Sequence, residues 1–146
     1  MGHESKYRVD ILDEEIAQEI CEAIASHPFG VRRLRKMNPH WPSIDTIFKW
    51  KRKFKDFAER YALAKFDQID VIVDEILDIA DDGSNDYYMG DHGLIADSEH
   101  INRSRLRIDS RKWLACKLAP KIYGDKIEKS INPEGQSLLQ NVIDKL

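Results

Sequence analysis

The longest stretch of this chain without a helix breaker constrains its fold most. Residues 56–82 contain neither glycine nor proline. Apolar side chains recur along this stretch at intervals of three and four: Phe57, Tyr61, Ala64, Ile69, Ile72, Val73, Ile76 and Ile79. That spacing is typical of one face of an α-helix and predicts a single helix of roughly eight turns. With only 7 glycines and 5 prolines in 146 residues, the whole chain is predicted to be mainly α.

A second helix is predicted over residues 99–119, where apolar positions alternate with Arg103, Arg107 and Arg111 at every fourth residue. The long helix carries a matching stripe of carboxylates: Asp67, Asp70, Asp74 and Asp78. We expect the two helices to pair as a long antiparallel hairpin whose register is set by these charges, since exposed ion pairs contribute only about 0.2–1 kcal/mol each. So small a core leaves apolar seams uncovered, which predicts self-association.

The segment between these helices, residues 83–99, is rich in glycine, aspartate and serine and predicts a mobile loop. Asp86, Asp91, His92 and Asp97 are residue types that bind metals. Because no two of them share helical i, i+4 spacing with a third ligand fixed nearby, we predict no metal site.

Three short helices are predicted before the long one. A four-residue apolar repeat predicts a helix over residues 12–26, and a second helix is expected over 31–37. Prolines at 39 and 42 then break the chain, and Ser43 is a good N-cap for the third helix. Its apolar face is predicted to contain Ile44, Ile47, Phe48, Trp50 and Phe54. Its opposite face is predicted to contain Asp45, Thr46, Lys49, Arg52 and Lys53. This order of helices is typical of a helix-turn-helix module, whose third helix lies in a DNA major groove.

The charge distribution supports that interpretation. Formal net charge is -3, but residues 28–55 hold nine basic residues and one acid, so a cationic module is embedded in an acidic protein. Lysine and arginine side chains neutralise phosphates. We predict that Thr46, Lys49 and Lys53 reach base edges and that Arg52 lies on the same DNA-facing side of the third helix. The alternative is a merely solvated charged face. Trp41 and Trp50 are expected in the core.

The sequence divides into three predicted parts: a helix-turn-helix domain (1–54), a central helical oligomerisation domain (55–123) and a C-terminal strand or tail segment (124–146). In the last part an extended stretch is expected at 125–131, a turn at 132–135 and a short amphipathic helix at 138–146. Cys21 and Cys116 are expected to be small buried residues. No apolar run is long enough for a membrane span, and neither a signal peptide nor a membrane partner is expected.

Motifs of catalysis are missing from the sequence. It contains no phosphate-cradling glycine-rich loop, no HExxH and no nucleophile elbow. We therefore expect a non-enzymatic protein without a cofactor.

One run of residues resembles a known family. RLRIDSRKWLACKLAPKIYGDK, residues 105–126, is similar to the hallmark segment of the small terminase subunits of tailed bacteriophages. PSIDTIFKW, residues 42–50, is similar to the recognition-helix segment of the same family. The resemblance covers roughly residues 12–126.

The resemblance implies a subunit that binds the packaging-initiation site on double-stranded viral DNA and forms a homo-oligomeric ring of about eight to ten copies. It also implies that the chain recruits a large subunit carrying the ATPase and nuclease, in the cytoplasm of an infected or lysogenic bacterium. C-terminal strands would form an intersubunit barrel, although residues 138–146 have helical spacing. The phosphate contacts implied are Arg32, Arg33 and Lys36. The ring contacts implied are Ile69, Ile72, Val73, Ile76, Arg107, Arg111 and Trp113.

Two other functions remain open. A dimeric helix-turn-helix transcriptional regulator would share the DNA-binding module but have a two-fold oligomer and a palindromic site. A purely structural assembly protein would keep the ring and lack the DNA.

Overall fold

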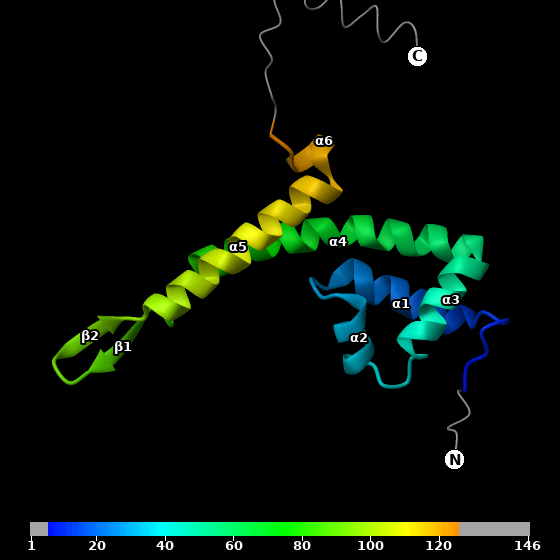
Figure 1. Ribbon diagram of the computed structural model, residues 1–146, viewed down its shortest axis with the longest axis horizontal. Coiled ribbons are helices and arrows are strands. Elements are labelled where there is room, and N and C mark those ends of the chain that lie inside the picture. The colour runs from blue at the N-terminus through cyan, green and yellow to red at the C-terminus, as the bar shows by residue number, and fades with distance from the viewer. Residues whose placement is uncertain (1–5, 126–146) are drawn as a thin grey trace, which may run out of the picture.

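The computed structural model describes residues 6–125, which are mainly helical as predicted (Figure 1). The elements in chain order are α1 (Glu14–Ser26), α2 (Val31–Met37), α3 (Ile44–Lys53), α4 (Lys55–Asp81), β1 (Tyr87–Gly90), β2 (Gly93–Ala96), α5 (Ser98–Leu118) and α6 (Pro120–Tyr123). The predicted C-terminal turn and tail helix fall outside the described residues, as does all but the first residue of the extended stretch. Within residues 6–125, no helix combines the length and apolarity needed to cross a bilayer.

Polar side chains begin three of the helices. The carboxylate of Asp13 accepts a hydrogen bond from the backbone N–H of Ile16, at the start of α1. Ser43 caps α3 by accepting from the N–H of Thr46, as predicted. Asp97 caps α5 in the same way. Each cap satisfies an N–H that has no partner inside its helix, and this fixes where the helix starts.

The N-terminal core is closed by the first turns of α4. Ile20, Ile24, Leu34, Ile47, Trp50 and Phe57 are its largest fully buried apolar side chains. Trp50 makes edge-to-face contacts with Tyr7 and Phe57, at ring-centroid distances of 6.0 and 6.3 Å. Its indole N–H donates to the carbonyl of Arg8 at 2.8 Å. Trp41 is also buried, which confirms both tryptophans as core residues.

A buried glutamine joins the α1–α2 loop to the middle of α4. The side-chain amide of Gln68 donates to the carbonyls of His27 (2.7 Å) and Phe29 (2.9 Å), and the side chain is only 2% exposed. Its amide oxygen accepts a hydrogen bond from Lys65 at 2.6 Å. A buried amide satisfied in this way holds two segments in one arrangement.

The central part is the antiparallel pair of α4 and α5, as predicted (Figure 1). Ile69 of α4 packs against Ala115 and Ala119 in a small second core, where Tyr123 of α6 also lies. The Tyr123 hydroxyl donates to Asp70 at 2.6 Å. α4 therefore belongs to both cores: Phe57, Tyr61 and Ala64 to the first and Ile69 to the second.

The prediction that the arginines of α5 pair with the aspartate stripe of α4 is wrong. Arg107 and Arg111 both reach Glu75, at 3.7 and 2.8 Å, and not the aspartate stripe. Arg103 pairs with Glu99 of its own helix. Glu75 lies on the flank of α4 that faces α5, whereas Asp67, Asp74 and Asp78 point to solvent.

The segment predicted to be a mobile loop contains a β-hairpin instead. β1 and β2 pair antiparallel in the register Tyr87↔Ala96, Tyr88↔Ile95, Met89↔Leu94 and Gly90↔Gly93. The two-residue turn at 91–92 is followed by Gly93, whose φ of 124° is favourable for glycine. Aromatic and β-branched residues in 87–96 favour the strands and outweigh the turn-forming residues around them.

Candidate nucleic-acid interface

The turn between α2 and α3 is held by hydrogen bonds that fix the two helices relative to each other. Arg35 donates from Nε to the carbonyl of Pro42 at 2.8 Å. The Asn38 side chain donates to the carbonyl of Leu34 at 2.9 Å, at the end of α2. Leu34 and Ile47 are buried on the inner sides of the two helices. The pair therefore presents a rigid outer surface, which is what a helix-turn-helix needs to fit a groove.

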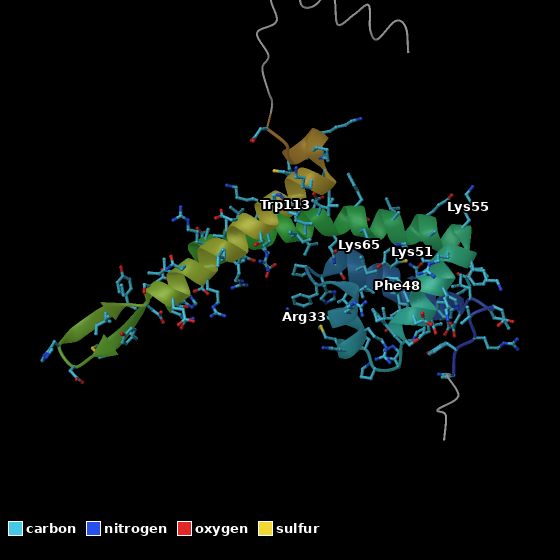
Figure 2. All side chains as sticks on the ribbon, in the orientation of Figure 1. Arg33, Phe48, Lys51, Lys55, Lys65 and Trp113 are labelled. Carbon is cyan, nitrogen blue, oxygen red and sulfur yellow. The ribbon has the colours of Figure 1, made fainter. Side chains whose placement is uncertain are left out.

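The rotation of α3 differs from prediction at two residues. Thr46 is 5% exposed, and its hydroxyl lies 3.0 Å from the Ser43 hydroxyl, so it cannot reach a base edge. Phe48 lies on the outward side, half-buried, where it is labelled in Figure 2. Helical spacing puts Arg52, four residues on, beside Phe48, and Lys49 beside Arg52. The predicted base-reading role of Thr46 is therefore wrong, because its side chain faces the core.

The cations of α2 and α3 differ in how they are held. Arg32, Lys36 and Arg52 are exposed, with no hydrogen bond or ion pair among residues 6–125. Lys49 pairs with Asp45 at 2.7 Å on the surface, a contact that water and salt weaken. Arg33 stacks on Phe29, 3.7 Å from the ring centroid. These cations keep their charge available for an anionic ligand.

Lys53 lies on the flank of α3, close to the Arg8–Asp10 pair. The pKa of Asp10 is lowered, first by the hydrogen bond from Arg8 and least by the charge on Lys53. Lys53 is exposed, but the carboxylate offsets part of its field. Of the predicted DNA-facing residues on α3, Lys49 and Arg52 lie most directly on the outward side.

Two further cations were missed in the sequence. Lys51 lies over the ring of Tyr61, with Nζ 4.4 Å from its centroid, and Lys65 follows one helical turn later on α4 (Figure 2). Burial, and secondarily the charge on Lys51, lowers the pKa of Lys65. Lys65 follows Tyr61 by four residues, which is the spacing of neighbours on one helix face. Together the two lysines extend the basic surface from α3 onto α4.

Comparison with known proteins identifies the family. A model of the family described as bacteriophage Sf6, terminase small subunit-like, matches residues 12–130. The chain belongs to this family of small terminase subunits. Members of this family are generally non-catalytic subunits that bind DNA and regulate packaging.

Solved structures agree with that assignment. Three crystal structures of the terminase small subunit gp1 of the bacterial virus Sf6, each a different single-substitution variant, match at 31% sequence identity. Each match covers 86% of this chain and 88% of the Sf6 chain, with TM-scores of 0.66 to 0.67. Among curated proteins none matches this chain.

The ring contacts implied for this small terminase subunit lie in two kinds of environment. Ile69 packs against Ala115 and Ala119 in the α4–α5 pair, Ile72 is also buried, and Arg111 pairs with Glu75. Arg107 also pairs with Glu75 but is more exposed. Trp113, in contrast, is 64% exposed on the outer side of α5 (Figure 2).

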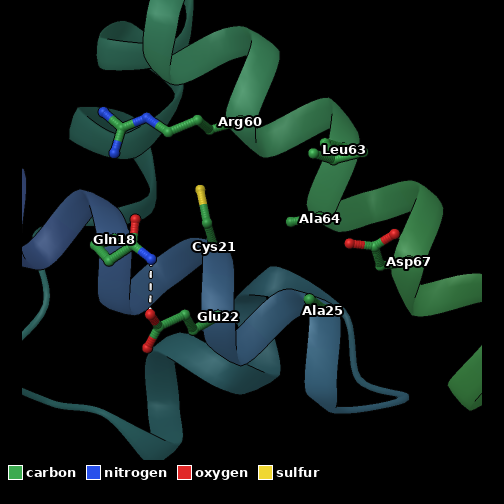
Figure 3. A pocket seen from close by; sticks show the side chains of 8 residues that line it. All are labelled: Gln18, Cys21, Glu22, Ala25, Arg60, Leu63, Ala64 and Asp67. Carbon is green, nitrogen blue, oxygen red and sulfur yellow. Dashed lines mark hydrogen bonds between the residues drawn. The ribbon is translucent and has the colours of Figure 1, made fainter.

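The α1–α4 contact of this small terminase subunit leaves a shallow groove of about 200 Å³ (Figure 3). Arg60 borders it and ties the two helices together through Glu14 of α1 at 2.9 Å, and a second ion pair at 2.9 Å joins it to Asp56 of its own helix. Burial raises the pKa of the Cys21 thiol in its wall, so the thiol stays protonated and unreactive. Cys21 is buried as predicted, whereas Cys116 is half-buried, with its thiol donating to the carbonyl of Tyr123.

Metal-ligating side chains do not converge in the described part of this small terminase subunit. No group of three His, Cys, Asp or Glu residues within 6–125 is placed to hold an ion. In the hairpin region, His100 Nε2 lies 4.0 Å from Asp86 Oδ1.

Proposed function

We propose that this small terminase subunit binds the packaging-initiation site on double-stranded viral DNA through α2 and α3, without catalysing a reaction itself. It assembles into a homo-oligomeric ring and recruits the large ATPase-nuclease subunit, in the cytoplasm of the bacterial host. The C-terminal segment, 124–146, is the proposed contact for the large subunit.

One observation carries the DNA-binding proposal: the outward side of α3 combines Phe48, Lys49 and Arg52 on a rigid module. Arginine and lysine read guanine edges in the major groove, and an aromatic side chain packs on the thymine methyl group. Arg32 and Lys36 of α2 neutralise phosphates beside the groove. Family membership supports this interpretation.

A single module of this size contacts few bases, so its affinity is low. A ring presents many copies to one DNA molecule and raises the overall affinity by avidity. Assembly is therefore part of the proposed mechanism and also sets the geometry in which the DNA is bound.

Fluorescence anisotropy on a DNA fragment carrying the cognate packaging site tests the proposal. Lys49→Glu combined with Arg52→Glu is expected to weaken binding at least tenfold, because it removes two base-reading cations and adds two charges that repel the phosphates. Arg105→Glu is the control, because it reverses one charge at an exposed site on α5, and each single variant of α3 can be compared with it. Equal binding by the double variant and the control contradicts the assignment of α3.

Native mass spectrometry of the wild-type chain separates this function from its alternatives. A closed oligomer of many copies that binds DNA is expected. A two-fold dimer on a palindromic site would instead indicate a transcriptional regulator, and a ring without DNA affinity would indicate a structural protein.

A further inference from the structure

The β-hairpin is an apolar surface that the rest of residues 6–125 leaves uncovered. Within the described residues, β1 and β2 pair only with each other and pack against no helix, and they lie beyond the ends of α4 and α5 (Figure 1). The register puts Tyr87, Met89 and Leu94 on one face, 61%, 75% and 71% exposed. Tyr88 and Ile95 lie on the other face.

Such a hairpin needs a partner. A two-stranded sheet alone is marginally stable in water, and its outer edges carry unpaired backbone groups. Contiguous exposed apolar side chains of this size mark an interaction surface. The arrangement therefore indicates that another polypeptide covers the hairpin.

The negative charge of the hairpin region indicates what kind of partner surface can bind it. Residues 81–99 contain six acids and no lysine or arginine. A complementary surface has exposed apolar groups flanked by bases, since complementary charge steers association and rejects wrong partners.

The opposite end of α5, with α6, has this chemistry. Residues 111–121 hold four basic residues and no acid. Trp113, Leu118 and Ile122 are all at least half exposed there. The exposed bases around them are Lys112, Lys117 and Lys121.

These two surfaces cannot meet within one chain. α5 has 21 residues and separates them, which at 1.5 Å per residue is about 30 Å. Figure 1 places β1 and β2 at one end of α5 and α6 at the other. Only a second copy can bring its basic end to the hairpin.

We propose that the acidic apolar hairpin of one copy docks on the basic apolar end of α5 and α6 of a second copy. This contact rests on the proposed homo-oligomer and names the surfaces that form it. It is heterologous, because two different patches meet, and a repeated heterologous contact closes into a ring when the rotation allows.

Two variants test the two patches separately. The hairpin variant carries Met89→Glu and Leu94→Glu, and the helix variant carries Trp113→Glu and Leu118→Glu. All four side chains are exposed, so circular dichroism should give wild-type helix content for both. By native mass spectrometry at micromolar concentration, each variant alone is expected to be monomeric.

Mixing the two variants at equal concentration is the decisive measurement. The mixture retains one intact pair of patches, so a heterodimer and no larger species is expected. Met37→Glu is the matched control, since Met37 is 53% exposed on α2 and far from both patches in the sequence; it should assemble like the wild type.

Other outcomes overturn the inference in distinguishable ways. A hairpin variant that assembles like the wild type refutes the hairpin contact and leaves the ring intact. A helix variant that still dimerises alone means that hairpins pair with each other. A mixture that stays monomeric means that the two patches are not partners. A monomeric wild type refutes the proposed ring itself, and this inference with it.

Discussion

Arg111 donates a hydrogen bond from Nε to a carboxylate oxygen of Glu75, 2.8 Å away, across the α4–α5 pair. Glu75 also lies 3.7 Å from Arg107 and is only partly exposed. Replacing Glu75 by glutamine keeps the shape and removes the charge, which we expect to cost about 1 kcal/mol of unfolding free energy. Urea denaturation at fixed protomer concentration measures this. Glu99→Gln, which removes a highly exposed pair with Arg103, should change stability by less than about 0.5 kcal/mol.

Gln68→Ala should be more damaging. It removes the donor of two hydrogen bonds and leaves the carbonyls of His27 and Phe29 without that partner in a buried place. A loss of about 2–3 kcal/mol is expected. Asp67→Ala, the exposed neighbouring residue, is the control and should stay within about 0.5 kcal/mol of the wild type. Equal effects would mean that the amide does not anchor the α1–α2 loop.

Trp50→Phe tests the N-terminal core. The smaller ring leaves a void and loses the indole hydrogen bond to the Arg8 carbonyl, together costing about 2–3 kcal/mol. Trp113→Phe makes the same change on an exposed side chain and should cost less than about 0.5 kcal/mol. Unfolding followed by circular dichroism compares the two without relying on tryptophan fluorescence.

Lowering the pH should destabilise the turn that leads from α4 into the β-hairpin. Hydrogen bonds from the hydroxyl and the backbone N–H of Ser84 lower the pKa of Asp82 below 3.8. Because the folded pKa is the lower one, the carboxylate stabilises this turn above pH 3.8, and the stabilisation is lost as pH falls through the lowered pKa. Carboxyl NMR titration measures the shift directly. Ser84→Ala should return the pKa of Asp82 towards 3.8; an unchanged pKa would refute the assignment.

The sequence predicted the helices well because their apolar period and caps are local signals. It failed where contacts between residues far apart in the sequence determine which side of a helix is buried. Thr46 faces the core and Phe48 faces outward, the reverse of the prediction, because the N-cap bond to Ser43 and the packing of Trp50 set the rotation of α3. Glu75 was overlooked because the facing side of α4 depends on where α5 crosses it.

The hairpin was missed for a different reason. Its strands have four residues each, too short for a period of two to stand out against the surrounding glycine and aspartate. The basic side of α2 and α3 was predictable from composition alone. The contribution of Lys51 and Lys65 required knowing that α4 runs beside α3.

Because α4 belongs to both cores, a tilt of this helix at one end displaces its other end. It has 27 residues, so it is about 40 Å long, and it passes from the N-terminal core into the α4–α5 pair without a break. A tilt of about 10° at one end therefore displaces the other by about 7 Å, which is roughly two base-pair steps of DNA. In the proposed ring, a small adjustment where copies meet would therefore change which base pairs lie opposite α3.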